Sequence, residues 1–395
     1  MSSVLDAARL LRVPLFLSAA SAVLFCVLAQ AIAGTFMALF AVQQAGLSPI
    51  ELSVFLTASA LTGIGASTWL GRRFDRHPGA TELLAVLALG IAGYALLATT
   101  TDFCWLVLIA AGPVGIGSAA FTLLFALAKR QLDAAGPVVA ERGVAALRMT
   151  SSLGWAIGPA IGGLLVGAWG FGGAFLGGAL CAAMALATVL VSGIWRVPAA
   201  PSHAVEVVHL EVPRGRAALA VGSIALFHMA MFMGSIALSI TTVTEMGGSE
   251  TDVGLLFSLC AAIEVVVMGA FVAWPTRGSR QRWMLAGFAV FALYFLLLAL
   301  FPSLAMAYWA QFPRAVAIGI VSVVGMLYLQ ALMPTRVGLA AGLFSSAISV
   351  GAVLAGVLTG PWASAFGYAS VFGFCVVLTG LGGLLLLGRQ QPSGG

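Results

Sequence analysis

The stretch SSLGWAIGPAIGGLLVGAW, residues 151–169, places a Gly-Pro pair and further glycines inside a segment that is otherwise apolar enough to be a helix. In water, Gly costs a helix interior about 1 kcal/mol and Pro about 3 kcal/mol relative to Ala. A soluble protein would therefore form a loop here. A membrane helix tolerates both residues, because neighbouring helices satisfy the backbone groups that they leave unpaired.

The composition of the whole chain favours the membrane. Of 395 residues, 61% are hydrophobic and 8% are charged, against about 25% charged in an ordinary soluble domain. Apolar runs of about 20 residues, the length that crosses a bilayer as a helix, recur between short polar hinges. The chain is therefore expected to be an all-α integral membrane protein, and its N-terminus lacks the pattern of a removable signal peptide.

Hydropathy windows of about 19 residues predict twelve transmembrane helices. Their ranges are 14–41, 49–70, 81–100, 104–128, 144–168, 171–194, 217–243, 252–274, 283–301, 304–331, 338–364 and 368–388. The basic residues test this count, because Lys and Arg gather on the cytoplasmic side of a membrane protein. With these twelve helices, every hinge that contains Lys or Arg falls on the same side of the membrane. The hinges on the opposite side carry acidic residues such as Glu51, Asp102 and Asp252. We therefore expect both termini in the cytoplasm and the chain in a bacterial inner membrane.

An internal repeat divides the spans into two pseudo-symmetric six-helix bundles. A shift of 197 positions aligns Ser152, Gly154, Gly163, Ala168, Gly170 and Phe175 with Ser349, Gly351, Gly360, Ala365, Gly367 and Phe372. The expected parts are an N-terminal bundle (1–195), a Pro-rich cytoplasmic linker (196–216) and a C-terminal bundle (217–395). Two such halves with a substrate site between them are typical of the major facilitator fold.

The opening stretch has the spacing G-x3-G-P-x2-G-G and resembles the antiporter motif of major facilitator exporters. Its residues are Gly154, Gly158, Pro159, Gly162 and Gly163. Glycines at i, i+4 and i+8 clear one helix face so that another backbone can approach closely. Generic packing of small residues is the alternative. The full motif begins with one more glycine, where this chain has Ala145.

The hinge GRRFDRHPGATEL, residues 71–83, resembles the superfamily's loop motif between the second and third helices. Gly71, Asp75 and Arg76 stand at the expected offsets, whereas Pro78 replaces a family glycine. A carboxylate among arginines can form a charge-assisted latch, and we group Arg148 at the start of the fifth span with this cytoplasmic gate. A simple positive-inside anchor is the alternative.

Two ionisable residues lie near the middle of predicted spans, where charges are expensive and commonly functional. They are Glu264 in the eighth span and Arg314 in the tenth. An apolar setting favours the neutral form of a carboxyl group, which suits a group that takes up and releases a proton. The alternative is a structural ion pair. Polar candidates for a substrate cavity are Gln30, Ser59, Gln311, Tyr328 and Gln330, although helix packing also explains such residues.

Several stretches together resemble the sugar efflux transporter family of bacterial major facilitator exporters. They are TASALTGIGASTWLGRRFD, LFALAKR, LRMTSSLGWAIGP, AAIEVVVMGAF and VGMLYLQALMP. The resemblance implies export of lactose, glucose, small glucosides or thiogalactosides in exchange for protons. It places Arg148, Glu264, Tyr328 and Gln330 at matching positions. The seventh span lacks the expected Asn residues, so a cavity poorer in amides would favour alkyl or aryl glycosides, or drugs.

We therefore predict a proton-coupled exporter of small sugars or glycosides that works by alternating access. Its expected partners are a small-molecule substrate, protons and the lipid bilayer, with no nucleic acid, and it is expected to be a monomer. No enzyme, cofactor or metal is expected, because the five cysteines are scattered singly and no catalytic cluster is present. One alternative remains open, a multidrug or other amphiphile exporter. A membrane receptor is disfavoured, because it would require a soluble signalling domain and no hinge is long enough to hold one.

Overall fold

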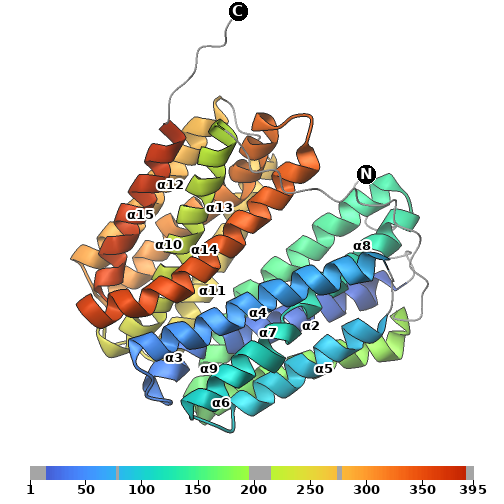
Figure 1. Ribbon diagram of the computed structural model, residues 1–395, viewed down its shortest axis with the longest axis horizontal. Helices are drawn as coiled ribbons and strands as arrows, with labels where there is room; N and C mark the ends of the chain where they lie inside the picture. Colours follow the sequence, from blue (N-terminus) through green and yellow to red (C-terminus); the bar gives the residue numbers. More distant parts are fainter. Residues whose placement is uncertain (1–14, 77–79, 195–214, 274–277, 388–395) are drawn as a thin grey trace, which may run out of the picture. The chain divides into compact units, whose positions relative to one another are not determined.

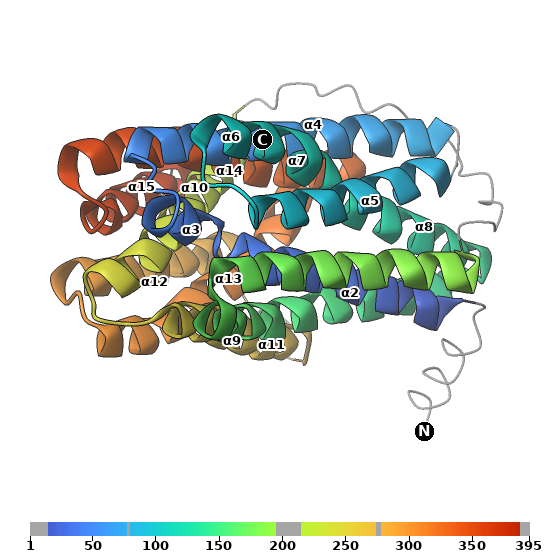
Figure 2. The same cartoon turned by 90° about the horizontal axis from the view of Figure 1, so that it is seen from below.

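The computed structural model describes residues 15–76, 80–194, 215–273 and 278–387, and this part of the chain is helical without any strand (Figure 1). The elements, which Figure 2 shows from below, are α2 (Phe16–Gly34), α3 (Met37–Gln43), α4 (Pro49–Arg76), α5 (Ala80–Leu97), α6 (Phe103–Ile109), the π-helix η1 (Ala110–Val114), α7 (Gly115–Gly117), α8 (Ala120–Ala134), α9 (Pro137–Ser192), α10 (Arg216–Thr244), α11 (Glu250–Ala273), α12 (Arg280–Leu300), α13 (Leu304–Leu332), α14 (Val337–Phe366) and α15 (Ser370–Leu387).

Ten helical segments among the described residues are long and apolar enough to cross a membrane. Two features separate this number from the predicted twelve. Helix α9 has 56 residues and contains a break at Trp169 and Gly170, where Gly170 has a φ of 67°, so that it combines the predicted fifth and sixth spans. The apolar part of α5, Thr81–Leu97, is slightly too short to be counted. The number of crossings stays a prediction.

Two predicted spans are interrupted in ways that hydropathy does not indicate. The first is divided between α2 and α3 by a turn at Thr35 and Phe36. The fourth is divided among α6, η1, α7 and α8. Its π-helical part contains Gly112, with non-helical dihedral angles, and Pro113. Because proline has no N–H to donate, the ladder of hydrogen bonds widens at this point.

The chain forms two compact units. Unit 1 contains residues 1–47, 54–205 and 249–258, and unit 2 contains residues 48–53, 206–248 and 259–395. The start of α4 therefore belongs to unit 2, and the start of α11 belongs to unit 1. The expected linker lies outside the described residues except for Gly215 and Arg216. The division into two six-helix domains at this linker remains a prediction.

In unit 1, helix α2 packs along α9, and the aliphatic core spreads from this pair to α4, α5 and α8. Phe16 and Val23 of α2 belong to this core with Phe74 of α4, Leu83 of α5 and Leu123 of α8. The Phe40 ring of α3 makes edge contacts with the rings of Phe171 and Phe175, which follow the break in α9. Apolar contacts in unit 1 thus involve α9 on both sides of its break.

In unit 2, an aromatic core joins α10 to α12. The Phe227 ring stacks on Phe291 with ring centroids 4.4 Å apart, and Phe291 stacks in turn on Tyr294. Glycines make room for these rings, because a Cβ atom at Gly234 or Gly382 would overlap Phe295 or Phe288 respectively. The core therefore depends on small residues placed opposite large ones.

Large apolar side chains also cover the outward faces of the helices. Val191, Leu180 and Leu384 are 88, 63 and 61% exposed respectively. Soluble proteins rarely expose contiguous apolar surface of this kind. Together with the apolar helices, this surface identifies a multi-pass membrane protein.

Candidate transport site

Arg314 of α13 is the centre of a buried polar cluster in unit 2. Its side chain is only 5% exposed. The Nη1 atom donates a hydrogen bond of 3.0 Å to Oε1 of Gln311, and Nη2 donates one of 2.8 Å to Oγ of Ser235 on α10. A guanidinium group remains charged in proteins. A permanent positive charge is therefore held inside unit 2 by an amide and a hydroxyl group.

The two acceptors are themselves oriented by the helix backbone. Nε2 of Gln311 donates to the carbonyl oxygen of Ala307 over 2.8 Å, and Oγ of Ser235 donates to that of Met231 over 2.7 Å. Each side chain thereby uses its proton locally and turns an oxygen lone pair toward Arg314. The arginine is held in one position by groups that are already fixed.

Tyr294 of α12 forms another wall of the cluster. The Cζ atom of Arg314 lies 5.8 Å from the centre of the Tyr294 ring, a cation–π distance. The ring is 1% exposed, and its hydroxyl group has no hydrogen-bond partner among the described residues. An unsatisfied buried hydroxyl is costly, so this group is available to a polar ligand or a water molecule.

Glu264 of α11 lies within electrostatic reach of this cluster. Its side chain is half-buried, and its charge interacts electrostatically with Arg314. Helices α11 and α13 approach closely here because Gly319 has no side chain. A Cβ atom at Gly319 would lie 2.7 Å from Cγ1 of Val267 and 3.9 Å from the carbonyl oxygen of Glu264. The structure thus brings together Glu264, Arg314 and Gln311, which the sequence singled out separately.

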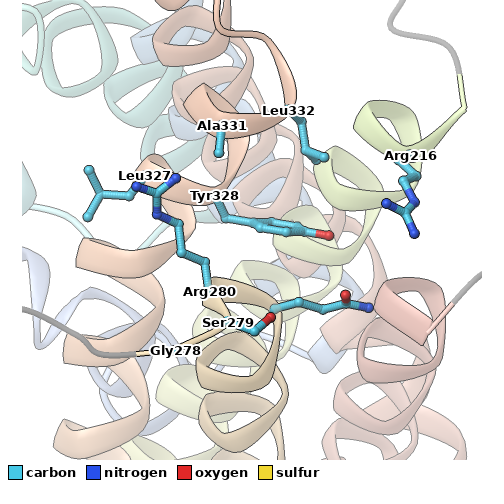
Figure 3. Close-up of a pocket in the computed structure, with 9 residues that line it drawn as sticks. Arg216, Gly278, Ser279, Arg280, Leu327, Tyr328, Ala331 and Leu332 are labelled. Carbon is cyan, nitrogen blue, oxygen red and sulfur yellow. The ribbon is translucent and has the colours of Figure 1, made fainter. Parts of the chain in front are cut away.

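The other cavity candidates lie elsewhere. Tyr328 is near the end of α13, 14 residues beyond Arg314 and therefore roughly 21 Å farther along the helix. There it lines a cavity of about 540 Å³ with Arg216 and Arg280 (Figure 3). Gln330, two residues later on α13, is half-buried. Neither side chain joins the Arg314 cluster.

Gln30 and Ser59 belong to unit 1. Nε2 of Gln30 lies 3.9 Å from Sγ of Cys26, one turn earlier on α2. Ser59 is half-buried on α4, and its carbonyl oxygen would lie 3.1 Å from a Cβ atom at Gly115. Ser59 is thus placed where two segments of unit 1 pack together, whereas the contact of Gln30 lies within α2. The role of both residues in a cavity remains a prediction.

Three glycines of the opening stretch line the face of α9 that packs on α2. A Cβ atom at Gly154 would lie 2.7 Å from Cγ1 of Val27, and one at Gly158 would lie 2.5 Å from Cβ of Ala31. At Gly162 the same atom would lie 2.7 Å from the carbonyl oxygen of Ile32. Any side chain at these positions would push the two helices apart.

The next face of α9, which includes Pro159 and Gly163, packs on the start of α11. Gly254 lies against the carbonyl oxygen of Pro159, so closely that a Cβ atom would overlap it. Oγ of Ser258 accepts a hydrogen bond of 2.9 Å from the backbone N–H of Ala160, the residue after the proline. A Cβ atom at Gly163 would lie 3.1 Å from the carbonyl oxygen of Glu250. The motif thus supports two helix contacts at once.

The residues of the predicted cytoplasmic gate are only partly described. Gly71 is half-buried with open space at its Cα, and Arg148 is exposed. The side chains of Asp75 and Arg76 lie outside the described part of the structure. The hinge does contain an ion pair that the sequence analysis missed, because Nε of Arg73 donates to Oε1 of Glu82 over 2.7 Å.

Sequence reasoning also missed Ser235, Tyr294 and Cys260 as neighbours of Arg314. Ser235 was detectable in principle as a polar residue in an apolar span, but a single serine carries little signal. No group of three His, Cys, Asp or Glu residues suited to a metal ion occurs in the described residues.

Comparisons with known proteins agree with this fold. The family model described as Major Facilitator Superfamily matches residues 220–395. A Deinococcus radiodurans protein that carries the provisional name sugar efflux transporter is 35% identical over 378 residues, which cover 94% of this chain and 97% of the relative. Sugar efflux transporter A of Escherichia coli (strain K12) is 30% identical over 87% of this chain and 88% of its own length.

Solved structures show the same fold at low sequence identity. A variant of the nucleoside transporter NupG superposes with a TM-score of 0.78 at 14% identity, covering 95% of this chain and 99% of the transporter. The structural likeness supports the fold alone, and the relatives found by sequence show the family. The chain is a membrane transporter that belongs to the sugar efflux transporter family of the major facilitator superfamily.

Proposed function

We propose that this protein is a proton-coupled exporter of small sugars or glycosides that works by alternating access, with Glu264 as the proton-carrying group. The observation that carries the proposal is that unit 2 holds a half-buried carboxyl group within electrostatic reach of the buried, permanently charged Arg314. Within a transmembrane bundle such ionisable residues are functional candidates by default.

The chemistry of the pair supports coupling. When Glu264 is ionised, its charge attracts the guanidinium group of Arg314. Protonation of Glu264 removes this attraction, while Gln311 and Ser235 continue to hold Arg314. Two protonation states therefore differ in the forces on one side chain. A substrate that hydrogen-bonds to Arg314 or Gln311 would bind the two states with different affinity, which is the requirement for coupling.

Sugars are the substrate class that the relatives support. Two of them, aligned over most of their length, carry names that describe sugar efflux. Arginine, glutamine and tyrosine side chains in the cluster offer donors and an aromatic face that suit a hydroxylated ring. An amphiphile exporter is the second candidate, favoured by the largely apolar helix faces of unit 2.

For this function the protein would lie in a bacterial inner membrane as a monomer, with both termini in the cytoplasm. The segregation of Lys and Arg to one set of hinges supports this orientation. Single-cysteine variants test this orientation, with the cysteine in an Arg-bearing hinge or in an acidic hinge and a membrane-impermeant maleimide as the label. Reaction of the Arg-bearing hinges in intact cells would show that the orientation is the opposite one.

The coupling test uses purified protein in liposomes with an imposed pH gradient. Glu264→Gln keeps the size and hydrogen-bonding capacity of the side chain but cannot exchange a proton. We expect this variant to lose gradient-driven sugar accumulation and to retain sugar counterflow. Asp133→Asn is the matched control, because Asp133 is an exposed carboxylate paired with Lys129. Full gradient-driven accumulation by Glu264→Gln would exclude Glu264 from coupling.

The substrate test compares labelled lactose, an aryl glucoside and a cationic dye in the same liposomes. The proposal expects counterflow of lactose or the glucoside. Movement of the dye alone would replace the sugar assignment with the amphiphile exporter.

A further inference from the structure

A cavity of about 540 Å³ in unit 2 lies away from the Arg314 cluster, at the end of α13 and beside the starts of α10 and α12. Its polar lining consists of Arg216, Ser279, Arg280, Gln281 and Tyr328. Figure 3 shows the Tyr328 ring across the middle of the cavity, with its hydroxyl group on the side of Arg216 and with Arg280 on the other side. Side chains from three helices therefore converge on one space.

Arg216 and Arg280 are the charged residues in the described lining of this cavity. No acidic side chain is among the described lining residues, and neither arginine forms an ion pair with a residue that the structure describes. Arg216 and Arg280 are the first residues of α10 and α12, and neither helix has an acidic residue in its first turn. The N-terminus of a helix already carries a partial positive charge, so an arginine there adds to an unfavourable potential.

Helix starts at the opposite hinges of the chain are built differently. Ser48 and Glu51 form a capping pair at the start of α4, and Ser249 and Asp252 form one at the start of α11. Ser279 precedes α12 in the same way, yet its side chain makes no capping hydrogen bond. The Ser279 hydroxyl group at the start of α12 is therefore available to another partner.

Gln281 is held in place by a hydrogen bond. Its Nε2 atom donates to the carbonyl oxygen of Leu386 over 2.5 Å. Two guanidinium groups, a serine hydroxyl and a phenol thus surround a space large enough for a small anion and an attached organic group.

We propose that this cavity binds a phosphate group. Arginine pairs match phosphate in both charge and hydrogen-bond geometry, and the cavity lies at the end of unit 2 that the sequence predicts to be cytoplasmic. The phosphate has two potential sources, an anionic phospholipid headgroup or a soluble phosphorylated sugar whose ring packs on Tyr328. The proposal concerns binding at a second site and does not depend on proton coupling or on sugar export.

The experiment measures binding to the full-length purified protein in two arms. The soluble arm measures equilibrium binding of labelled glucose 6-phosphate and inorganic phosphate in neutral detergent, with glucose as the uncharged reference. The lipid arm measures retention of phosphatidylglycerol by native mass spectrometry after exchange from nanodiscs that contain phosphatidylcholine and phosphatidylglycerol.

Three variants separate a built site from general positive charge. Arg216→Gln/Arg280→Gln removes both arginines of the cavity. Ala331→Phe fills the cavity without any change in charge, and Ala331 is exposed, which favours normal folding. Arg282→Gln is the matched control, because Arg282 lies in the same first turn of α12 but does not line the cavity. Gel-filtration profiles and melting temperatures identify any variant that fails to fold.

We expect the double variant and Ala331→Phe to lose binding by on the order of tenfold or more, as for loss of charge-assisted hydrogen bonds, and Arg282→Gln to bind as the wild type does. Loss in the soluble arm assigns a soluble phosphate ester, and loss in the lipid arm alone assigns a phospholipid. Either result supports the site. Absence of phosphate binding in both arms, equal loss in Arg282→Gln, or full binding by Ala331→Phe would overturn it.

Discussion

Gly163 of α9 and Gly360 of α14 stand at corresponding positions of the internal repeat, yet their surroundings differ. A Cβ atom at Gly163 would make a tight contact with the start of α11, at 3.1 Å from the carbonyl oxygen of Glu250. A Cβ atom at Gly360 would overlap both the carbonyl oxygen of Pro49 and Oγ of Ser53 at the start of α4. The closer approach is therefore found in unit 2.

In unit 1 the equivalent close approach occurs one turn earlier, and the partner helix supplies the glycine. Gly254 of α11 packs against the carbonyl oxygen of Pro159. Counted from the capping serines Ser48 and Ser249, Gly254 stands where Ser53 stands in α4. Close contact between two helix backbones needs a small residue on only one of them. The glycine at the closest contact can therefore stand on one helix in the first half of the repeat and on the other helix in the second half.

Gly360→Ala should give the largest loss of stability. The added methyl group meets backbone and a side chain of α4 at overlapping distance, and overpacking of this kind costs about 3 kcal/mol. Unfolding in mixed detergent micelles measures the free energy. Gly380→Ala in α15 is the control, because nothing lies within 4 Å of its Cβ position, and it should be neutral or stabilising. Equal stability of the two variants would show that α4 does not pack closely on Gly360.

Gly163→Ala should have a smaller effect, about 1 kcal/mol, because the neighbouring backbone needs to move by only a few tenths of an ångström. The Cβ contacts there begin at 3.1 Å. The same unfolding measurement checks this value. If Gly163→Ala destabilised the protein more than Gly360→Ala, the order of the two contacts would be reversed.

Removing a serine hydroxyl group at either contact should cost slightly less. Oγ of Ser258 accepts the N–H of Ala160 over 2.9 Å, and Oγ of Ser53 accepts the N–H of Gly360 over 2.8 Å. Inter-helix hydrogen bonds in membrane proteins contribute about 0.6 kcal/mol on average. Ser258→Ala and Ser53→Ala should each lose about this amount in the unfolding assay. A loss by one variant and none by the other would mean that only one of the contacts persists in the membrane.

Thr57→Val should have the smallest effect. Counted from its capping serine, Thr57 of α4 stands where Ser258 stands in α11, but its Oγ1 atom is buried without a hydrogen-bond partner among the described residues. Replacing an unsatisfied hydroxyl with a methyl group of the same shape is nearly neutral or stabilising, so the change should stay within about 0.5 kcal/mol. A loss as large as that of Ser258→Ala would reveal a hydrogen bond of Thr57 in the membrane.

Local sequence patterns predicted much of the fold. Apolar length placed some helices closely, as for the predicted 304–331 and the observed Leu304–Leu332, but it missed other bounds by six or seven residues, as at the end of α4 and the start of α9. The glycine spacing in α9 predicted a face that another helix approaches closely, and α2 occupies that face. The interruption at Gly112 and Pro113 was missed, because a widened helical turn in a bundle keeps the same overall hydropathy.

The candidate site was predicted less completely. Glu264 and Arg314 stood out because charges are rare in apolar spans, but Ser235 and Tyr294 did not. Tyr328 was grouped with Gln311 as a candidate for one substrate cavity, whereas the structure places Tyr328 in a cavity away from the Arg314 cluster. Helices that are apolar on all faces have no stripe to indicate which side meets a neighbour.

The sequence by itself determined the membrane class, the approximate helix positions and the residues that carry charge into the bundle. These properties follow from composition and from spacing along one helix. Only the tertiary structure decided that Arg314 is held by Ser235 and Gln311, that Gly254 packs on Pro159, and that Tyr328 lies between two arginines. Such contacts depend on how each helix rotates about its axis and on how closely it approaches its neighbours, and both are set by the packing of side chains from distant parts of the chain.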